Sequence, residues 1–190
     1  MSTDTLHTLT EKPMNWRSGL LVLAALLQLA ILAGVYLGAK YPVWTGEPVT
    51  LRVVPVDPRD LFRGNYARLN YQVSSLPASL LPDNETLREG QRVYVTLTPG
   101  DDGFWQASAL SAERPAQGTV LRGRVLWVSG EQYALRFGIE AWFAPKEKAL
   151  ALEDTLREGG AAQVMLAANG KAALVAVGER PSEFVDKQQQ

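Results

Sequence analysis

Cysteine is absent from the chain, and histidine occurs once, as His7 near the N-terminus. Without a thiol the protein cannot use a cysteine nucleophile, bind a metal through thiolates or form a disulfide, and this absence suits either the cytoplasm or a periplasm. A lone imidazole in a polar tail also argues against a catalytic triad and a histidine-based metal site. We therefore expect no metal ion and no cofactor, and we assign no catalytic residue.

An excess of positive charge is missing as well. Lysine and arginine number 19 against 20 acidic residues, which gives a formal net charge of -1, and the sequence pI is about 5.9. Nucleic-acid binding requires a basic footprint, so we expect no nucleic acid among the partners. The length of 190 residues suits one domain of ordinary size with an appendage.

One stretch, Gly19–Ala39, carries no charge and has Gln28 as its only strongly polar side chain. A helix needs about 20 apolar residues to cross a bilayer core of about 30 Å, so the stretch predicts one transmembrane helix over 19–39. A polar tail, 1–18, precedes it, and a linker, 40–48, follows. The alternative is a cleaved signal peptide. However, the apolar region of a signal runs about 7–15 residues and ends at a small-x-small site, where this stretch has Leu37.

Basic residues flank both ends of the predicted helix, with Lys12 and Arg17 before it and Lys40 and Arg52 after it. The positive-inside comparison therefore discriminates weakly between the two orientations. The simpler topology keeps the short tail in the cytoplasm and places the larger domain on the other side of the membrane.

From residue 49 the chain consists of short alternating or β-branched runs separated by turn residues, which is typical of a mainly β fold. We expect a barrel-like or sandwich-like β-rich domain over 49–180, followed by a disordered tail at 181–190. Two short helices, near Ala78–Leu81 and at Lys148–Leu156, interrupt the strands. The predicted strands are Val49–Val56, Tyr66–Val73, Gln91–Thr98, Phe104–Leu110, Thr119–Val128, Tyr133–Ile139, Ala161–Ala168 and Ala172–Val177.

The β-rich part also contains similar segments in the same order. Residues 86–90, Thr-Leu-Arg-Glu-Gly, return as 155–159, and the Leu-Arg pair at 51–52 matches 121–122. Further along, Gly64, Leu69 and Tyr71 match Gly130, Leu135 and Phe137. These matches predict two duplicated β-units, about 49–111 and 119–178. The alternative is that such endings recur because glycine terminates helices well.

The densest polar segment lies at 57–71, where a turn between Pro58 and Gly64 leads into an alternating strand. From Gly64 to Tyr71 it resembles the Gly-Asp-Tyr-x-x-Leu-x-Tyr signature of the GDYXXLXY family, bacterial proteins described as membrane-anchored and without an assigned activity. The segments 56–60 and 138–145 also resemble the family. The motif residues here are Gly64, Asn65, Tyr66, Leu69 and Tyr71.

Asn65 stands where the family has Asp. The exchange replaces a carboxylate by an amide, which argues against any mechanism that needs a charge at this position. The resemblance fits the topology that we expect from the predicted helix, a single-pass protein of a bacterial inner membrane whose C-terminal domain is periplasmic.

Charged side chains near the motif, and a second polar group near Pro145, are the candidates for ligand binding. Guanidiniums make forked hydrogen bonds that suit an anionic or zwitterionic ligand, although a salt-bridged turn explains the same charges. If the two units are duplicated, the two groups occupy related positions and can face one cleft. The candidate binding residues are Asp57, Arg59, Asp60, Arg63, Arg68, Glu140 and Trp142.

Aromatic residues provide a further expectation. Tyr66 and Tyr71 fall on opposite faces of the predicted strand, so one of them is expected at a ligand or partner surface unless both faces are covered. The remaining large aromatics are expected mainly in the core, as is usual in small β-domains. They are Trp105, Trp127, Trp142 and Phe143.

The favoured interpretation is a non-enzymatic domain that binds a partner protein or an envelope component. A cell-envelope hydrolase acting through Asp57, Asp60 or Glu140 is the alternative from another class. A third interpretation is a subunit of a larger membrane complex, for which Gly34 and Gly38 have the spacing that permits close helix contact. The expected partners are thus the membrane itself and a membrane or envelope protein.

Overall fold

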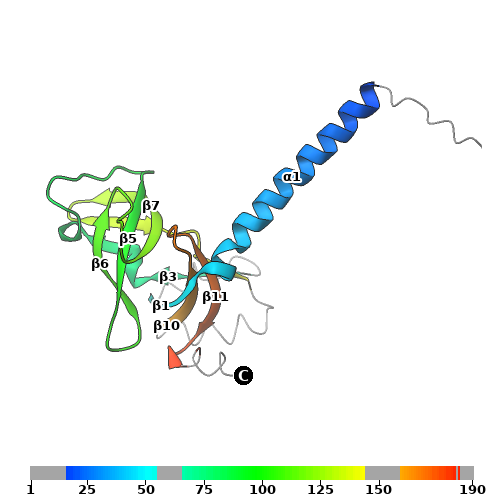
Figure 1. Cartoon of the computed structure of the whole chain (residues 1–190). Helices are drawn as coiled ribbons and strands as arrows, with labels where there is room; N and C mark the ends of the chain where they lie inside the picture. The colour runs from blue at the N-terminus through cyan, green and yellow to red at the C-terminus, as the bar shows by residue number, and fades with distance from the viewer. Residues whose placement is uncertain (1–15, 55–65, 144–158, 183, 185–190) are drawn as a thin grey trace, which may run out of the picture. The chain divides into compact units, whose positions relative to one another are not determined.

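A computed structural model describes residues 16–54, 66–143, 159–182 and 184 of the chain. The chain divides into two units, Met1–Gly38 and Ala39–Gln190. Figure 1 shows a long helix near the N-terminus and a domain built from strands. The predicted fold class, an apolar N-terminal helix followed by a mainly β domain, is therefore confirmed.

The apolar run forms α1 (Trp16–Thr45), a helix of 30 residues. Its most apolar window has a mean hydropathy of 2.5 and is not buried. The helix continues past Ala39 through Pro42, into the segment predicted as a linker. As the helix ends, the carbonyl of Pro42 accepts a hydrogen bond from Gly46 N at 2.9 Å.

Gly46 connects the helix to the first strand in a crowded place. A Cβ at this position would lie 2.3 Å from the oxygen of Pro42 and 2.9 Å from the nitrogen of Leu166. Backbone atoms cannot give way as a flexible side chain can, so this close approach requires glycine. The first strand, β1 (Glu47–Val54), begins at the next residue.

The larger of the sheets has five strands and curls into a nearly closed barrel. All neighbouring strands in it are antiparallel. In sheet order its strands are β4 (Ser75–Pro77), β8 (Gln132–Arg136), β7 (Thr119–Ser129), β5 (Arg92–Pro99) and β6 (Trp105–Ser111).

A second, four-stranded sheet contains β1 and has the strand order β11-β10-β1-β3. Two more strands, β2 and β9, pair only with each other among the described residues. The bounds are β2 (Tyr66–Arg68), β3 (Asn70–Tyr71), β9 (Ala141–Phe143), β10 (Gly160–Leu166) and β11 (Ala172–Gly178). Two short 3₁₀ helices, η1 (Gln72–Ser74) and η2 (Ala78–Leu80), flank β4.

The larger of two hydrophobic clusters draws its buried residues from both of the larger sheets. In β1 the residues Val49, Leu51 and Val53 are buried, and β5 contributes Val93 and Val95 to the same cluster. This alternation is what a strand with one face on the core requires. The local period of the sequence therefore fixed which side chains became core residues.

Several elements differ from those expected. The predicted strand Tyr66–Val73 is divided into β2, β3 and η1, and the predicted strand Tyr133–Ile139 ends at Arg136, just before Gly138 adopts a φ of 83°. The strands β4 and β9 were not predicted. The helix expected at Lys148–Leu156 lies outside the described residues.

The two predicted units pair reciprocally. Strand β1 of the first unit lies beside the β10–β11 hairpin of the second, and β7 of the second lies beside the β5–β6 hairpin of the first. Strand β2 of the first unit pairs with β9 of the second. Neither unit could form these sheets alone, because each supplies strands to the other. The duplication itself stays a prediction.

Candidate functional site

A groove with a volume of about 610 Å³ opens beside the motif segment. Its walls come from the chain around β3 on one side and from β7, β8 and the start of β9 on the other. We call it the motif groove. Its lining residues are Arg68, Leu69, Asn70, Ser74, Ser75, Leu126, Trp127, Ala134, Leu135, Arg136, Gly138, Glu140 and Ala141.

Two candidate residues from distant segments, Arg68 and Glu140, meet in this groove. The backbone brings them together, because Leu69 N donates a hydrogen bond to the carbonyl of Glu140 at 2.8 Å and Arg68 lies opposite Ala141 in the β2–β9 pair. The side chain of Leu69 is buried, whereas Arg68 and Asn70 are exposed. The motif segment therefore points its apolar residue into the core and its polar neighbours outward.

Tyr71 links the motif segment to the turn before β9 through a hydrogen bond. Its ring is buried in the core, and its hydroxyl donates a hydrogen bond to the carbonyl of Ile139 at 2.6 Å. Burial raises the pKa of the Tyr71 phenol above its ordinary value, and the negative charge of Glu140 raises it further. Of the two motif tyrosines, Tyr71 is thus a core residue. The backbone of Tyr66 belongs to β2, and its side chain is not among those described.

The carboxylate of Glu140 holds the turn that follows β8. Its Oε1 accepts the backbone N–H of Phe137, and its Oε2 accepts that of Gly138 at 2.9 Å. Both oxygens are therefore occupied by the protein itself. Among the described residues that line the groove, Glu140 is the one carboxylate. Each of its oxygens therefore holds one backbone N–H of the turn.

Trp127 lies in the groove and is 46% exposed, so the expectation that it belongs to the core is wrong. The cause is a β-bulge. The pairing of β7 with β8 shifts between Val125 and Trp127, which leaves Leu126 without a partner in the register. A bulge reorients the side chains that follow it, and Leu126 and Trp127 are both exposed beyond the buried Val125. The result is an exposed apolar wall opposite the polar side chains of the groove.

The other sequence-predicted candidates are not gathered here. Trp142 is half-buried in β9 and packs against the core. In the described ranges, no group of three or more histidine, aspartate or glutamate side chains is placed to hold a metal ion. Those outside the described residues are Asp57, Arg59, Asp60, Arg63, Gly64 and Asn65.

Sequence reasoning did not identify Arg136, Ser74 and Ser75 as groove residues. Ser75 donates a hydrogen bond to the side-chain oxygen of Gln132 at 3.3 Å, and the hydroxyl of Ser74 accepts one from Tyr71 N at 3.3 Å. Neither serine has a nucleophile motif around it, and only the pairing of β4 with β8 brings them to the groove.

Comparison with known proteins agrees with the resemblance of the motif segment. The sequence profile of the GDYXXLXY protein family matches residues 28–177. This range includes every residue that lines the motif groove. No curated protein and no solved structure matches the chain.

Proposed function

The chain belongs to the GDYXXLXY protein family, and we propose that it is a membrane-anchored binding protein. In this proposal α1 crosses a bacterial inner membrane once and the β domain lies on the periplasmic side. The motif groove then holds part of a partner protein or of an envelope component. The observation that carries the proposal is the groove itself, in which cationic, hydroxyl and exposed aromatic side chains meet at the motif.

The length of α1 supports an anchor. Its 30 residues correspond to about 45 Å at 1.5 Å per residue, which exceeds the hydrocarbon core of about 30 Å. A signal sequence also passes a test of length and composition, but its apolar region is usually about 7–15 residues long. The anchor therefore accounts better for a helix that stays apolar over so many turns.

The lining of the groove supports binding rather than hydrolysis. Aromatic and arginine side chains supply most of the energy at protein interfaces, and Trp127, Arg68 and Arg136 are exposed around the groove. A hydrolase acting through Glu140 would need a carboxylate free to exchange a proton, whereas Glu140 accepts two backbone N–H groups. The other acids of that alternative, Asp57 and Asp60, lie outside the described residues.

The first test concerns the anchor and its orientation. The full chain is expected in the membrane fraction at its full length, and a protease added to spheroplasts should digest the β domain while sparing a tag at the N-terminus. Recovery of a soluble form that begins near Lys40 would instead identify a signal sequence. Protection of the domain with an accessible tag would reverse the orientation.

The second test concerns the groove. Arg68→Ala and Trp127→Ala should weaken co-purification of bound material from solubilised membranes by about tenfold, in line with the loss of an exposed binding contact. Both side chains are exposed, so the melting temperature should stay close to that of the wild type. Arg88→Ala, at an exposed arginine that does not line the groove, is the matched control. Equal loss in all three variants, or none, would refute a role for the groove.

A further inference from the structure

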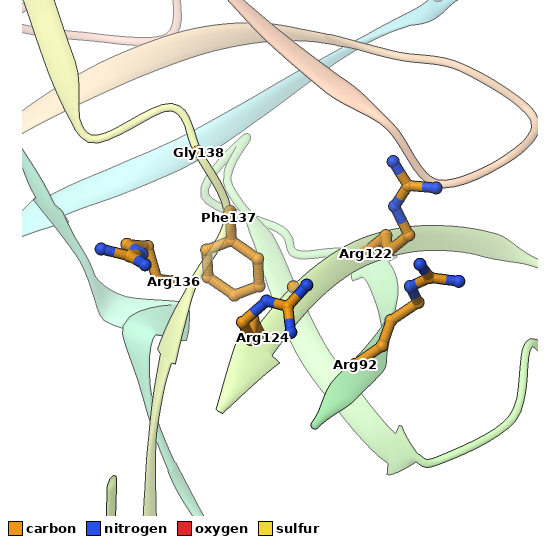
Figure 2. Close-up of a pocket in the computed structure, with 7 residues that line it drawn as sticks. Arg92, Arg122, Arg124, Arg136, Phe137 and Gly138 are labelled. Carbon is orange, nitrogen blue, oxygen red and sulfur yellow. The ribbon is translucent and has the colours of Figure 1, made fainter. Parts of the chain in front are cut away.

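A second pocket, with a volume of about 260 Å³, has arginine at four of its seven lining residues. We call it the arginine pocket, and Figure 2 shows its arginines around Phe137. It shares Arg136 and Gly138 with the motif groove. Its lining residues are Arg92, Arg122, Gly123, Arg124, Arg136, Phe137 and Gly138.

The register of the barrel aligns three of these arginines across neighbouring strands. Arg124 in β7 lies directly opposite Arg92 in β5 on one side and Arg136 in β8 on the other. Residues that are directly opposite point to the same face of a sheet, with Cβ atoms about 4.5–5.5 Å apart. Arg122 precedes Arg124 by two positions and therefore shares that face. The four arginine side chains thus start from the same face of three neighbouring strands.

Phe137 forms the apolar side of the pocket. A Cβ on Gly123 would lie 2.8 Å from two carbons of the Phe137 ring, so the absence of a side chain at 123 makes room for the ring. The ring is partly buried against the hydrophobic core, and it also lines the arginine pocket. The lining of the pocket therefore includes one aromatic ring as well as the arginines.

Within the described ranges, the positive charges of this pocket have no counter-charge. Like charges directly opposite each other destabilise a sheet. In the part of the chain that the structure describes, no carboxylate lies within ion-pair distance of any of the four arginines. Arg124 donates a hydrogen bond to the carbonyl of Gly90, which anchors its side chain but neutralises no charge.

Another arginine of the β domain illustrates the contrast. Arg52 in β1 donates a hydrogen bond to the carboxylate of Asp102 at 2.6 Å, and its guanidinium lies over the ring of Phe104. The chain has slightly more acidic than basic residues, so the arginine pocket is not the result of an excess of arginine and lysine. Its charge is concentrated at one place.

We propose that the arginine pocket binds a compact dianionic phosphate group, of the phosphomonoester kind. Such a group carries about -1.5 to -2 charges near neutral pH and presents three acceptor oxygens. Guanidiniums bind these oxygens through forked, charge-assisted hydrogen bonds. The ligand supplies the counter-charges that the described residues do not.

The size and charge of the pocket favour this ligand over other anions. A carboxylate brings one charge and two oxygens, which two guanidiniums already satisfy. A nucleic acid needs a basic surface that follows its backbone, whereas these arginines line a single pocket with a volume of about 260 Å³. That volume lies below the usual range of about 300–1,000 Å³ for pockets that hold whole small molecules. The pocket therefore suits a head group rather than a large ligand.

The test uses the full chain in a neutral detergent and measures binding by titration calorimetry with two probes. Glycerol 3-phosphate is a phosphomonoester without acyl chains, and dioctanoyl phosphatidic acid carries the same phosphomonoester on a short-chain lipid. Saturable binding of one phosphate per chain is expected. Equal affinity for the two probes identifies a soluble phosphate ester as the natural class, and binding of the lipid about tenfold more tightly identifies a lipid head group.

Variants assign the binding to the pocket. Arg92 and Arg122 line the arginine pocket but not the motif groove. Each of the substitutions Arg92→Gln and Arg122→Gln should weaken phosphate binding by about tenfold or more, which corresponds to the loss of a charge-assisted hydrogen bond. Arg88→Gln, at an exposed arginine outside the pocket, should change affinity by less than about twofold. Affinity for glycerol 3-phosphate should also fall as the pH drops below about 6, where the phosphate loses its second charge.

A stability measurement separates ligand binding from a scaffold role. Without ligand, Arg92→Gln should melt at the same temperature as the wild type or higher, because it relieves the repulsion with Arg124. The proposal is overturned if neither probe binds saturably at millimolar concentration, or if malonate binds as tightly as glycerol 3-phosphate. A lower melting temperature with unchanged phosphate affinity in Arg92→Gln would also overturn it.

Discussion

Tyr71→Phe should destabilise the β domain while leaving its shape intact. The residue is 1% exposed, and the substitution removes only the hydroxyl that donates to the carbonyl of Ile139 at 2.6 Å. A buried acceptor that loses its donor costs about 1–3 kcal/mol. We therefore expect the free energy of unfolding to fall by about that amount at pH 8.

The same substitution should alter the response to alkaline pH. Burial, followed by the charge of Glu140, raises the pKa of the Tyr71 phenol in the folded protein, whereas the unfolded chain ionises it with a pKa of about 10. The resulting stabilisation is fully present below pH 10 and is lost as the pH rises further. At pH 11 the wild type should have lost about 1.4 kcal/mol through this one group. Phenylalanine cannot ionise, so the variant is spared this loss.

The difference between wild type and Tyr71→Phe should therefore shrink by about 1.4 kcal/mol between pH 8 and pH 11. Urea unfolding of the full chain in neutral detergent, followed by tryptophan fluorescence, measures both values. Comparison within this pair cancels the other groups that titrate in the same range. Two results would refute the reasoning: a variant as stable as the wild type at pH 8, or a difference that stays constant up to pH 11.

Two further substitutions test the scaffold. Gly46→Ala should destabilise the β domain by about 1–3 kcal/mol in urea unfolding, because its Cβ would lie 2.3 Å from the oxygen of Pro42. The control is Gly34→Ala in α1, where a Cβ meets nothing within 4 Å. Equal effects of the two substitutions would contradict the crowding argument. Asp102→Asn should make the melting temperature less sensitive to acid between pH 5 and pH 3. The N–H of Phe104 and the guanidinium of Arg52 lower the pKa of the Asp102 carboxyl, so this stabilisation is present above the unfolded pKa of about 4 and is lost below it. If the melting temperature of the variant fell with pH as steeply as that of the wild type, Asp102 would not supply this stabilisation.

The sequence was sufficient to predict the elements whose signals are local. Alternation at Val49, Leu51 and Val53 identified a strand with one buried face, and an uncharged run identified α1. The short strands β4 and β9 span three residues each, which is too few for a period of two to be recognised. Their pairing depends on partners far away in the chain.

The candidate site was predictable only in part, for a related reason. Arg68 and Glu140 could be selected as charged residues in unusual local contexts, and they do line one groove. The exposure of Trp127 depends on a bulge, and the row formed by Arg92, Arg124 and Arg136 depends on the registers of β5, β7 and β8. A register is a property of two strands together, so inspection of either strand alone cannot reveal it.

The turn at 137–140 contributes to both pockets, and the motif segment forms hydrogen bonds with that turn. Gly138 lines both pockets, and its N–H is held by the side chain of Glu140. The carbonyl of Glu140 in turn accepts a hydrogen bond from Leu69 N, and the carbonyl of Ile139 accepts one from the hydroxyl of Tyr71.

If the two pockets bind ligands as proposed, two motif residues support that binding through the backbone groups that they hold. Leu69 and Tyr71 are both buried, yet each holds a carbonyl of the turn that carries Gly138. Arg136 precedes this turn and lines both pockets. Movement of the turn would therefore displace this one arginine from both pockets. On this reasoning the apolar and phenolic positions of the motif maintain the shape of the binding surfaces, while the exposed arginines and Trp127 supply the contacts.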